Sequence, residues 1–489
     1  MKRLIYSFSA IWMLLAVMAV SACSDSNSSI YGSGEQRLTV TSLDTLAIES
    51  LDFGSSAASK MIGINSNADW DVEVSADWVT TSARAGYGYA YETRMSWLRI
   101  DVERNSGVPR TATVTIKSGG LSRVIAINQS GTNADDTFEK ATEFIANVKL
   151  GYNLGNTLES NHDITDPSVQ SWFNPTTVYD WETCWGQPRT TPEIINTIAE
   201  RGFNLIRVPV TWFPHLDADD NVDEAWMNRV EEVVNYVLDA GCYCIINVHH
   251  DASEPDANRG DGAHWLVADL SQYETISPRF KHLWQQIAER FRDYGDRLLF
   301  EGINEIIDET GNWGNPANAD AYTAVNRLMQ DFVDVVRSTG GNNAFRNLVV
   351  NTYSAGHTQA KLNGFQAPSD QIPDHLLASI HSYDPYNFCN DNGEWNVLAF
   401  DKSCTDEIDE MFTMIDKRFR QELDLPYFYG EFGALDEGKS MAERVKYATY
   451  MAQKFKAYNT VGLWWMGLLK RNTLEWYEDD IVTALFDNI

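Results

Sequence analysis

The second part of the chain, from Phe138 to Ile489, alternates between short apolar runs and amphipathic segments of helical period. Residues 227–238, for example, place valines at 230, 233, 234 and 237, and Gly241 separates them from the apolar run 243–248. Such alternation is typical of parallel βα units. The expected strands cover residues 150–156, 203–209, 243–248, 298–303, 347–351, 376–380, 426–431 and 462–465. This pattern predicts an α/β fold, a (β/α)8 TIM barrel of about 350 residues over 138–489.

Residues 36–131 follow a different pattern, in which short runs of period two are separated by turn residues. Leu98, Ile100 and Val102 alternate with neighbours such as Trp97, so one set should face a core and the other should face outward. We therefore predict a small all-β, immunoglobulin-like sandwich in front of the barrel. Residues 132–137 would link the two domains.

Residues 1–22 have the features of a signal peptide. A positively charged start is followed by an apolar run over 5–20 and by Val-Ser-Ala-Cys at 20–23. The tetrapeptide resembles a bacterial lipobox, which implies lipidation of Cys23, and residues 23–35 would form a flexible tether. We expect an exported protein that is lipid-anchored to the outer membrane at the cell surface. Plain secretion is the alternative.

Composition limits the partners. A formal net charge of −31 argues against binding to nucleic acid or to an anionic membrane surface, so membrane contact would run only through the lipid anchor. Of the five cysteines after Cys23, no pair has the spacing of a metal site with nearby histidines. Cys389 and Cys404 flank one loop and could form a disulfide, whereas Cys242 and Cys244 should pack as apolar groups. We expect a monomer.

Two of the expected strands run into glutamates, Glu305 and Glu431. A carboxylate at the end of a buried strand is costly without partners, so two of them suggest one shared site. Paired carboxylates are what glycosidic-bond hydrolysis needs. Other strand-end side chains are Asn156, Arg207, His249, His250, Asn304, His381, Tyr383 and Trp465. The C-terminal ends of barrel strands form active sites, so we expect these side chains to converge.

Motifs in the barrel region occur in an order that resembles glycoside hydrolase family 5, with subfamily 4 endoglucanases the most similar. They are Asn-Leu-Gly-Asn-Thr-Leu at 153–158, Trp-Gly-Gln-Pro at 185–188, Ile-Arg-Val-Pro at 206–209, Asn-Val-His-His-Asp at 247–251, Phe-Glu-Gly-Ile-Asn-Glu at 300–305 and Gly-Glu-Phe-Gly at 430–433. Ala-Asp-Trp at 68–70, with the closing Asn-Gln-Ser-Gly at 128–131, makes the sandwich resemble a BACON-type module. That module would be a spacer, an interface or a sugar-binding domain.

The resemblance to family 5 implies a retaining double displacement. Glu431 would be the nucleophile, kept ionised by Arg207 and the Tyr383 hydroxyl. Glu305 would be the acid/base, and Asn304 would bind the sugar 2-hydroxyl. The remaining substrate-binding residues would be His249, with His250 as its alternative, His381 and Trp465. This chemistry needs no metal and no organic cofactor.

Aromatic residues in the loops predict an extended cleft. Trp185, Trp212, Trp265 and Trp395 follow four different strands and could bind sugars of a plant β-1,4-linked glucan. Endo-action on xyloglucan, mixed-linkage β-glucan or soluble cellulose is the favoured function. The alternatives are a β-mannanase or xylanase with the same machinery, and a non-catalytic surface glycan-binding lipoprotein. One departure bears on the substrate, because residues 466–468 read Met-Gly-Leu where the subfamily commonly has Asp-Asn-Gly.

Overall fold

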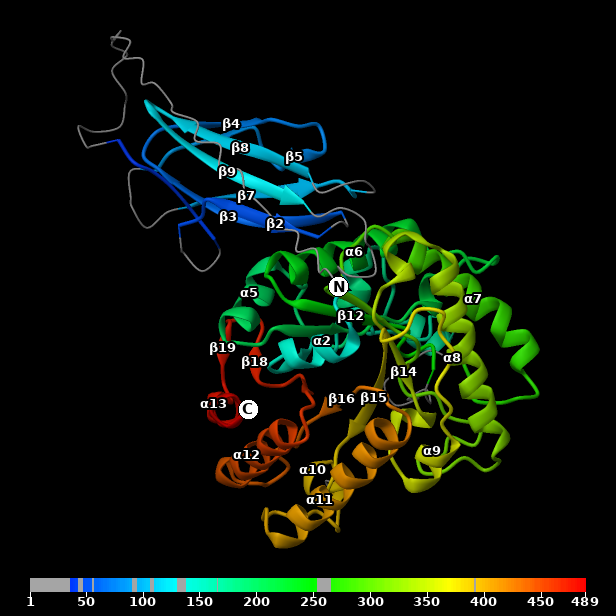
Figure 1. Cartoon of the computed structure of the whole chain (residues 1–489). Coiled ribbons are helices and arrows are strands. Elements are labelled where there is room, and N and C mark those ends of the chain that lie inside the picture. The colour runs from blue at the N-terminus through cyan, green and yellow to red at the C-terminus, as the bar shows by residue number, and fades with distance from the viewer. Residues whose placement is uncertain are drawn as a thin grey trace, which may run out of the picture.

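A computed structural model describes residues 36–42, 47–54, 57–89, 95–105, 110–129, 138–164, 166–252, 265–390 and 393–489. The predicted signal segment, the lipidation site Cys23, the tether and the interdomain linker lie outside these residues. Within the described part of the chain, no helix is both long and apolar enough to cross a membrane. Figure 1 shows an all-β domain and a barrel domain, as the sequence predicts.

The N-terminal domain is a sandwich of two β-sheets. One sheet has the order β1 (Leu38–Thr41), β3 (Ala58–Ser66), β7 (Ser96–Val102), β5 (Val79–Thr81). The other has the order β2 (Ser50–Phe53), β9 (Leu121–Gln129), β8 (Arg110–Ser118), β4 (Trp70–Val74), β6 (Ala85–Gly86). The period-two prediction is confirmed in β7, where Leu98, Ile100 and Val102 are buried and Trp97 is 48% exposed. Side chains from both sheets form one core.

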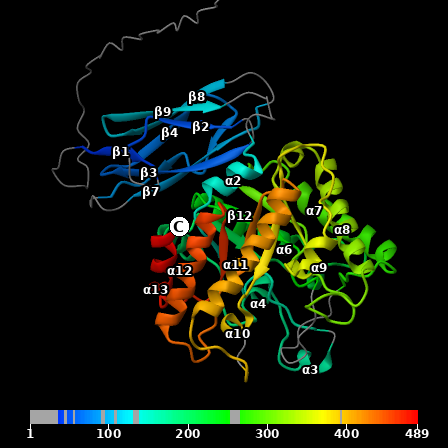
Figure 2. The same ribbon diagram turned by 60° about the horizontal axis from the view of Figure 1, so that its bottom comes forward.

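The C-terminal domain is a closed barrel of eight parallel strands in chain order, which confirms the predicted TIM barrel (Figures 1 and 2). The strands are β10 (Gly151–Asn153), β11 (Leu205–Val208), β12 (Tyr243–Asn247), β13 (Leu298–Glu301), β14 (Leu348–Asn351), β15 (Leu376–Ser382), β16 (Tyr427–Phe432) and β17 (Gly462–Trp465). The longer helices around them are α5 (Pro192–Glu200), α6 (Glu224–Asp239), α7 (Tyr273–Arg290), α8 (Asp320–Ser338), α11 (Lys402–Asp416), α12 (Met441–Ala457) and α13 (Asp479–Asn488).

Short elements fill the connections. They are α3 (Pro167–Gln170), α4 (Val178–Glu182), η1 (Phe213–His215), η2 (Gly341–Ala344), η3 (Tyr353–Ala355), α9 (Gln359–Gly364), α10 (Tyr386–Cys389), the π-helical turn η4 (Lys417–Glu422) and the hairpin β18 (Leu469–Lys470) with β19 (Glu475–Trp476). Most of them lie between the C-terminal end of one strand and the next long element. They therefore shape the end of the barrel at which the polar strand-end residues lie.

Helix α6 illustrates how the sequence sets the barrel wall. The Asp223 side chain accepts a hydrogen bond from the Trp226 backbone N–H and caps the first turn. The valines at 230, 233, 234 and 237 recur at helical spacing, and all four are fully buried against the strands. Gly241 follows the helix with a φ of +78°, a conformation that favours glycine.

Helix α2 (Ala141–Asn147) closes the N-terminal end of the barrel. Its buried Phe144 packs with Tyr243 at the start of β12 and with Phe428 in β16. Because this end is filled by an apolar plug, the opposite end is the one that is free to hold a polar site.

The sandwich lies on the side of the barrel where α2 and α6 are found (Figures 1 and 2). Strand β3 contacts α6, and Asp239 at the end of α6 lies within electrostatic reach of Arg99 and Asp101 on β7. Arg99 and Asp101 share the outward face of β7 with Trp97. Part of that face is therefore an interface with the barrel, on the side away from the C-terminal strand ends.

All five cysteines of the described residues are free thiols. Cys389 Sγ points to the Asp384 carbonyl at 3.4 Å and Cys404 Sγ to the Ala399 carbonyl at 3.8 Å, so the disulfide that the sequence allowed is not formed. Cys242 and Cys244 are buried in the barrel core, as predicted.

Candidate active site

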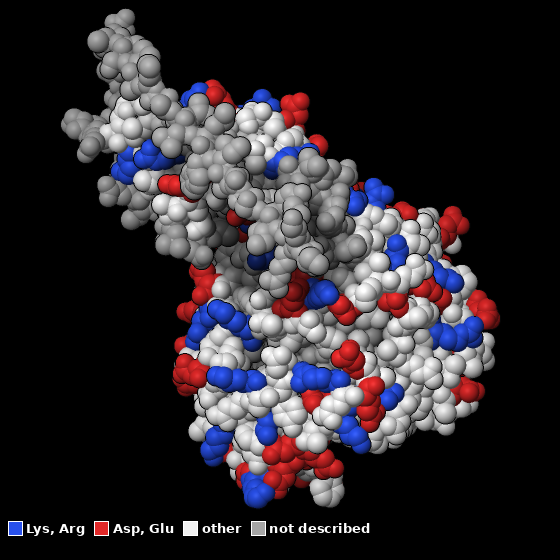
Figure 3. Space-filling model, in the orientation of Figure 1, with Lys and Arg blue, Asp and Glu red and all other residues white. Residues whose placement is uncertain are grey.

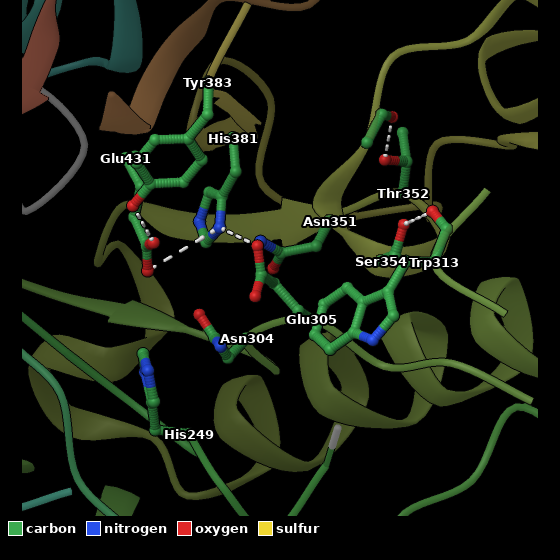
Figure 4. Close-up of polar contacts among 12 residues, drawn as sticks. His249, Asn304, Glu305, Trp313, Asn351, Thr352, Ser354, His381, Tyr383 and Glu431 are labelled. Atoms are coloured by element: carbon green, nitrogen blue, oxygen red, sulfur yellow. Dashed lines mark hydrogen bonds and ion pairs between the residues drawn. The ribbon is translucent and has the colours of Figure 1, made fainter. Parts of the chain in front are cut away.

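Glu305 and Glu431 come together at the C-terminal end of the barrel, with His381 between them (Figure 4). One oxygen of each glutamate and a ring nitrogen of His381 all lie within 4.8 Å of one another. A group of this kind could hold a cation, but the Arg207 guanidinium on Glu431 already supplies positive charge there. One oxygen of each carboxylate therefore lies close enough for the pair to act on one bond, as in retaining glycosidases, whose carboxyl groups are about 5–5.5 Å apart.

A local irregularity between β15 and β16 positions Glu431. The register of the two strands shifts after Ile380, so that His381 pairs with Glu431. Gly430 makes the close approach possible, because a Cβ at this position would lie only 2.3 Å from the Ser379 Oγ. The shift thus places the two side chains against each other at the mouth of the barrel.

Glu431 is buried and receives two strong hydrogen bonds. Arg207 Nη1 lies 2.9 Å from its Oε1, and the Tyr383 hydroxyl donates to its Oε2 at 2.8 Å. Burial and the nearby Glu305 raise the pKa of Glu431 above its ordinary value, although His381, Arg207 and the Tyr383 hydroxyl oppose this shift by stabilising the carboxylate. The donors hold the anion in a fixed orientation.

Glu305 is the more accessible carboxylate, with 20% of its side chain exposed against 6% for Glu431. Its Oε1 lies 2.8 Å from His381 Nδ1, and the same nitrogen is 3.6 Å from Glu431 Oε1. Burial lowers the pKa of His381, but the two glutamates raise it by more, so the pKa lies above its ordinary value. His381 therefore tends to carry a proton between the two carboxylates.

Arg207 hydrogen-bonds to several side chains at the base of the site, and its guanidinium is fully buried. Besides Glu431, it donates to Glu301 Oε2 at 2.6 Å, to Asn304 Oδ1 at 2.8 Å and to Asn153 Oδ1 at 3.1 Å. Because the Asn304 oxygen is occupied by Arg207, its amide N–H groups are the ones left to face a substrate.

His249 is held as a neutral ring with a defined proton position. Asn247 Oδ1 accepts from the Val210 backbone N–H at 3.1 Å, which turns its amide nitrogen toward His249 Nδ1 at 3.0 Å. His249 Nδ1 must then accept, so the ring proton sits on Nε2. Burial, with nearby positive charge, lowers the pKa of His249 well below its ordinary value.

Trp465 is the last residue of β17, and its role as a sugar platform stays a prediction. Its ring stacks on that of His249, with centroids 5.9 Å apart and planes within 10°. A Cβ on Gly155 would lie 3.0 Å from the Trp465 ring, so glycine lets the first loop pass beneath the indole.

The other predicted residues divide into three groups. Asn156 adopts a φ of +58° in the first loop, where its backbone N–H binds Glu159, and its role toward a substrate stays a prediction. Trp185 packs against His250 with centroids 5.3 Å apart, and Trp395 is 70% exposed on the rim, so both remain candidates for sugar contact. The Trp265 indole N–H donates to Asp251 Oδ1 at 2.7 Å, and the Arg279 guanidinium lies over its ring. Both its N–H group and one face of its ring therefore already have partners within the protein.

The prediction for Trp212 is wrong. Its side chain is fully buried, and its indole N–H donates to the Asn247 carbonyl at 2.9 Å. A ring in this position supports the strand that carries His249 and has no face open to a sugar.

Residues that sequence reasoning missed form the layer beneath the site. They are Asn153, Asn247, Glu301 and Asn351, all buried. Glu301 accepts from Asn247 Nδ2 and Asn351 Nδ2, each at 3.1 Å, in addition to Arg207. Burial raises the pKa of Glu301, but Arg207, His381 and Asn351 together lower it by more, so the pKa lies below its ordinary value and Glu301 is a buried anion. The signal that could have identified these residues is a polar residue inside an apolar strand. A buried polar side chain is costly unless it has hydrogen-bonding or charged partners.

A hollow of about 390 Å³ lies beside the residues that follow Trp465 in the chain. It is lined by Met466 and Gly467 and, across from them, by Gly186, Gln187 and Tyr477. Met466 and Gly467, two of the three residues at the departure noted in the sequence, therefore line this hollow.

A TIM barrel that holds two facing carboxylates at its C-terminal end, one bound by buried arginine and tyrosine donors, has the site of a glycoside hydrolase. The cellulase model of glycosyl hydrolase family 5 matches residues 168–467, and the BACON model matches residues 68–130. The chain therefore belongs to glycoside hydrolase family 5 and carries a BACON domain before the barrel, which confirms both resemblances.

Individual relatives agree with this assignment. Endoglucanase A of Ruminococcus albus is 33% identical over 365 residues, which cover 71% of this chain and 92% of that protein. The family 5 enzyme PbGH5A of Prevotella bryantii B14 is 38% identical with a TM-score of 0.65, covering 72% of this chain and 98% of that one. The family 5 xyloglucanase of Bacteroides ovatus is 26% identical with a TM-score of 0.63, covering 93% and 99%. The protein is an endo-β-1,4-glucanase-type glycoside hydrolase.

Proposed function

We propose that the protein cleaves β-1,4-glucan chains internally with retention of configuration, using Glu431 as nucleophile and Glu305 as acid/base. The observation that carries the proposal is that one oxygen of Glu305 and one oxygen of Glu431 lie within 4.8 Å of each other, with His381 between the two glutamates. An inverting pair would need roughly 6.5–9.5 Å between its carboxyl groups to admit a water molecule.

The geometry supports a two-step reaction. The Glu431 carboxylate attacks the anomeric carbon while Glu305 gives its proton to the leaving oxygen, which forms a glycosyl ester on Glu431. Glu305, now a carboxylate, takes a proton from water, and the water oxygen attacks the same carbon and frees Glu431. The exposure of Glu305 suits exchange of this proton with the leaving group and water, while the buried Arg207 stabilises the departing carboxylate.

Xyloglucan is the substrate that we favour. The Bacteroides ovatus xyloglucanase, solved with an XXXG heptasaccharide, is similar over both domains. PbGH5A was solved with a xyloglucan tetradecasaccharide, and the structure of a Ruminococcus champanellensis enzyme is described as a broad-specificity endoglucanase. The open hollow beside Trp465 offers room for a branched chain. Mixed-linkage β-glucan and soluble cellulose come next, and mannan or xylan remain alternatives.

We also propose that the protein is exported and held at the outer membrane, as a monomer, by a lipid on Cys23. The motif at residues 20–23 supports this anchor. On the face in Figure 3, acidic and basic side chains are interspersed, and the net charge of −31 fits a neutral polymer as partner. Replacing Cys23 by Ser should abolish incorporation of a labelled fatty acid and release the protein from the membrane fraction. Labelling that persists in the variant would contradict the anchor.

The catalytic proposal is tested with the purified protein on xyloglucan, mixed-linkage β-glucan, carboxymethylcellulose, galactomannan and xylan. Release of oligosaccharides from the glucans, with β-anomers seen first by NMR, is the expected result, and Glu431→Ala should be inactive. Activity on galactomannan or xylan alone would change the substrate and keep the mechanism. Absence of hydrolysis on every polymer, with binding retained, would favour the glycan-binding alternative.

A further inference from the structure

The loop after β13, residues 302–319, carries an aromatic residue that sequence reasoning did not select. Trp313 has 44% of its surface exposed, and in Figure 4 its indole lies on the same side of the site as Glu305. An acid/base protonates the leaving oxygen, so under the proposed function this is the side on which the leaving half of the chain lies. Trp465, the predicted sugar platform, lies at the end of β17 and stacks on His249, which Figure 4 shows apart from Trp313.

The loop is braced from within. Asp308 Oδ2 accepts the Ala317 backbone N–H at 2.7 Å, and Asp308 Oδ1 accepts the Thr310 hydroxyl at 2.6 Å. The Tyr353 hydroxyl, from η3, donates to the Asn312 carbonyl at 2.8 Å. The backbone that precedes Trp313 is therefore fixed before any substrate arrives, which reduces the entropic cost of binding to its ring.

A buried lysine holds Trp313 itself. Lys361 is only 4% exposed, and its Nζ donates to the Trp313 carbonyl at 2.8 Å and to Ser354 Oγ at 2.6 Å. Burial lowers the pKa of Lys361 to about 8, opposed by the charges of Glu305 and Asp384. An ammonium group is costly to bury, so its retention beneath the loop calls for a role.

The segment η3, which carries Tyr353 and Ser354, has an unusual backbone conformation. Ser354 and Ala355 have φ values of +51° and +47°, in the left-handed region that non-glycine residues seldom adopt. The Ser354 backbone N–H donates to the Ile306 carbonyl at 2.8 Å, which ties η3 to the residue that follows Glu305. Backbone strain of this kind concentrates at functional sites, where surrounding contacts maintain it.

We propose that Trp313 is the platform for the first sugar of the leaving half of the substrate, a neutral hexopyranose, and that Lys361 is a positioning residue that fixes this platform beside Glu305. The proposal rests on the proposed function. A rigid indole face offers an apolar surface to the axial C–H groups of a β-linked sugar, and its fixed backbone sets the height of that surface relative to the acid/base.

The test compares two substrates in the full-length protein. Cellopentaose fills both halves of the cleft, whereas cellotriosyl fluoride places no sugar on the leaving side. Trp313→Ala should lower kcat/KM on cellopentaose by roughly tenfold or more and leave kcat/KM on the fluoride unchanged within about twofold. Trp313→Phe, which keeps an aromatic face, should retain most of the activity on cellopentaose. Trp97→Ala, an exposed tryptophan in the sandwich, is the control and should change neither value.

Lys361→Met removes the ammonium group while keeping most of the side-chain volume. It should reproduce the split between the two substrates, and the double variant with Trp313→Ala should be no worse than Trp313→Ala alone, because the lysine acts through the tryptophan. Equal losses on both substrates, or cellopentaose hydrolysis that is insensitive to Trp313→Ala, would overturn the proposal. A wild-type protein that hydrolyses neither of these substrates and no xyloglucan would overturn the proposed function itself.

Discussion

Arg207 and Glu301 form an ion pair with a distance of 2.6 Å in which neither side chain has any exposed surface. A buried pair of this kind is weak evidence for stability, because desolvation offsets much of the attraction. Here the remaining nitrogens of Arg207 bind Glu431 and Asn304. We therefore interpret Glu301 as a positioning residue that holds the Arg207 guanidinium in the orientation in which it hydrogen-bonds to both Glu431 and Asn304.

Replacing Glu301 by Gln should lower kcat on the order of tenfold or more with little change in KM. The amide has a single oxygen, so its NH2 group would face either the Arg207 and Asn247 donors or the Asn351 donor, and the negative charge that orients the guanidinium would be lost. Stability should also fall, by roughly 3 kcal/mol, because a buried charge loses its partner. Kinetics on xyloglucan and urea unfolding measure the two effects.

The matched control is Asp370→Asn. Asp370 pairs with Arg337 at 2.6 Å and its side chain is 4% exposed, but the pair joins α8 to the segment before β15, away from the glutamates. This variant should lose stability and keep kcat. If Glu301→Gln behaved in the same way, Glu301 would be a structural residue only.

The second prediction concerns the pH dependence of stability. Glu431 and Glu305 raise the pKa of His381 against the lowering effect of burial. Its charged form therefore stabilises the fold fully below the unfolded pKa of about 6.5, and this contribution is lost as pH rises through the higher folded value. The difference in unfolding free energy between wild type and His381→Asn should be larger at about pH 6 than at about pH 9.

His375→Asn is the control of opposite sign. Burial, with Arg337 nearby, lowers the pKa of His375 to about 4. Its neutral form contributes stability above the unfolded pKa of about 6.5, and that contribution decreases as pH falls, so the stability difference should be smaller at about pH 6 than at about pH 9. The same trend in both variants would show that a general effect, not the glutamate pair, governs His381.

The barrel and its strand-end residues could be predicted because both leave local signals in the sequence. Apolar period and turn residues mark each strand, and a polar residue at its end stands out. The layer beneath could not be predicted in this way, because it depends on register between strands. Asn153 lies opposite Arg207, and Asn247 lies opposite Glu301, pairings that no spacing along the chain records.

The same limit explains the error at Trp212. Its position after a strand was correct, but whether a ring faces the cleft or the wall depends on the backbone turn into η1. The indole donates to the Asn247 carbonyl and has no exposed surface. Trp212→Phe should therefore destabilise the protein by about 1–3 kcal/mol and leave KM unchanged. Trp395→Ala, at a ring that is 70% exposed, should leave stability unchanged. A raised KM in Trp212→Phe at full stability would restore the original prediction.

The last prediction concerns the proton on His249. Asn247 Nδ2 donates to His249 Nδ1, so nitrogen NMR of the wild type should show a neutral ring protonated at Nε2. In Asn247→Ala this donor is lost, both tautomers become populated, and the donor that Nε2 offers to a substrate is present only part of the time. We expect kcat/KM to fall, on the order of tenfold, together with the change in the nitrogen spectrum.

Asn351→Ala separates this effect from one transmitted through Glu301. Asn351 Nδ2 donates to Glu301 Oε1 at 3.1 Å, as Asn247 Nδ2 donates to Oε2, so each variant removes one amide donor from the same carboxylate. Only Asn247 also contacts His249. An equal loss of activity in both variants, with the His249 tautomer unchanged, would assign the role of Asn247 to Glu301. A larger loss in Asn247→Ala, accompanied by the tautomer change, would assign it to the orientation of the His249 proton.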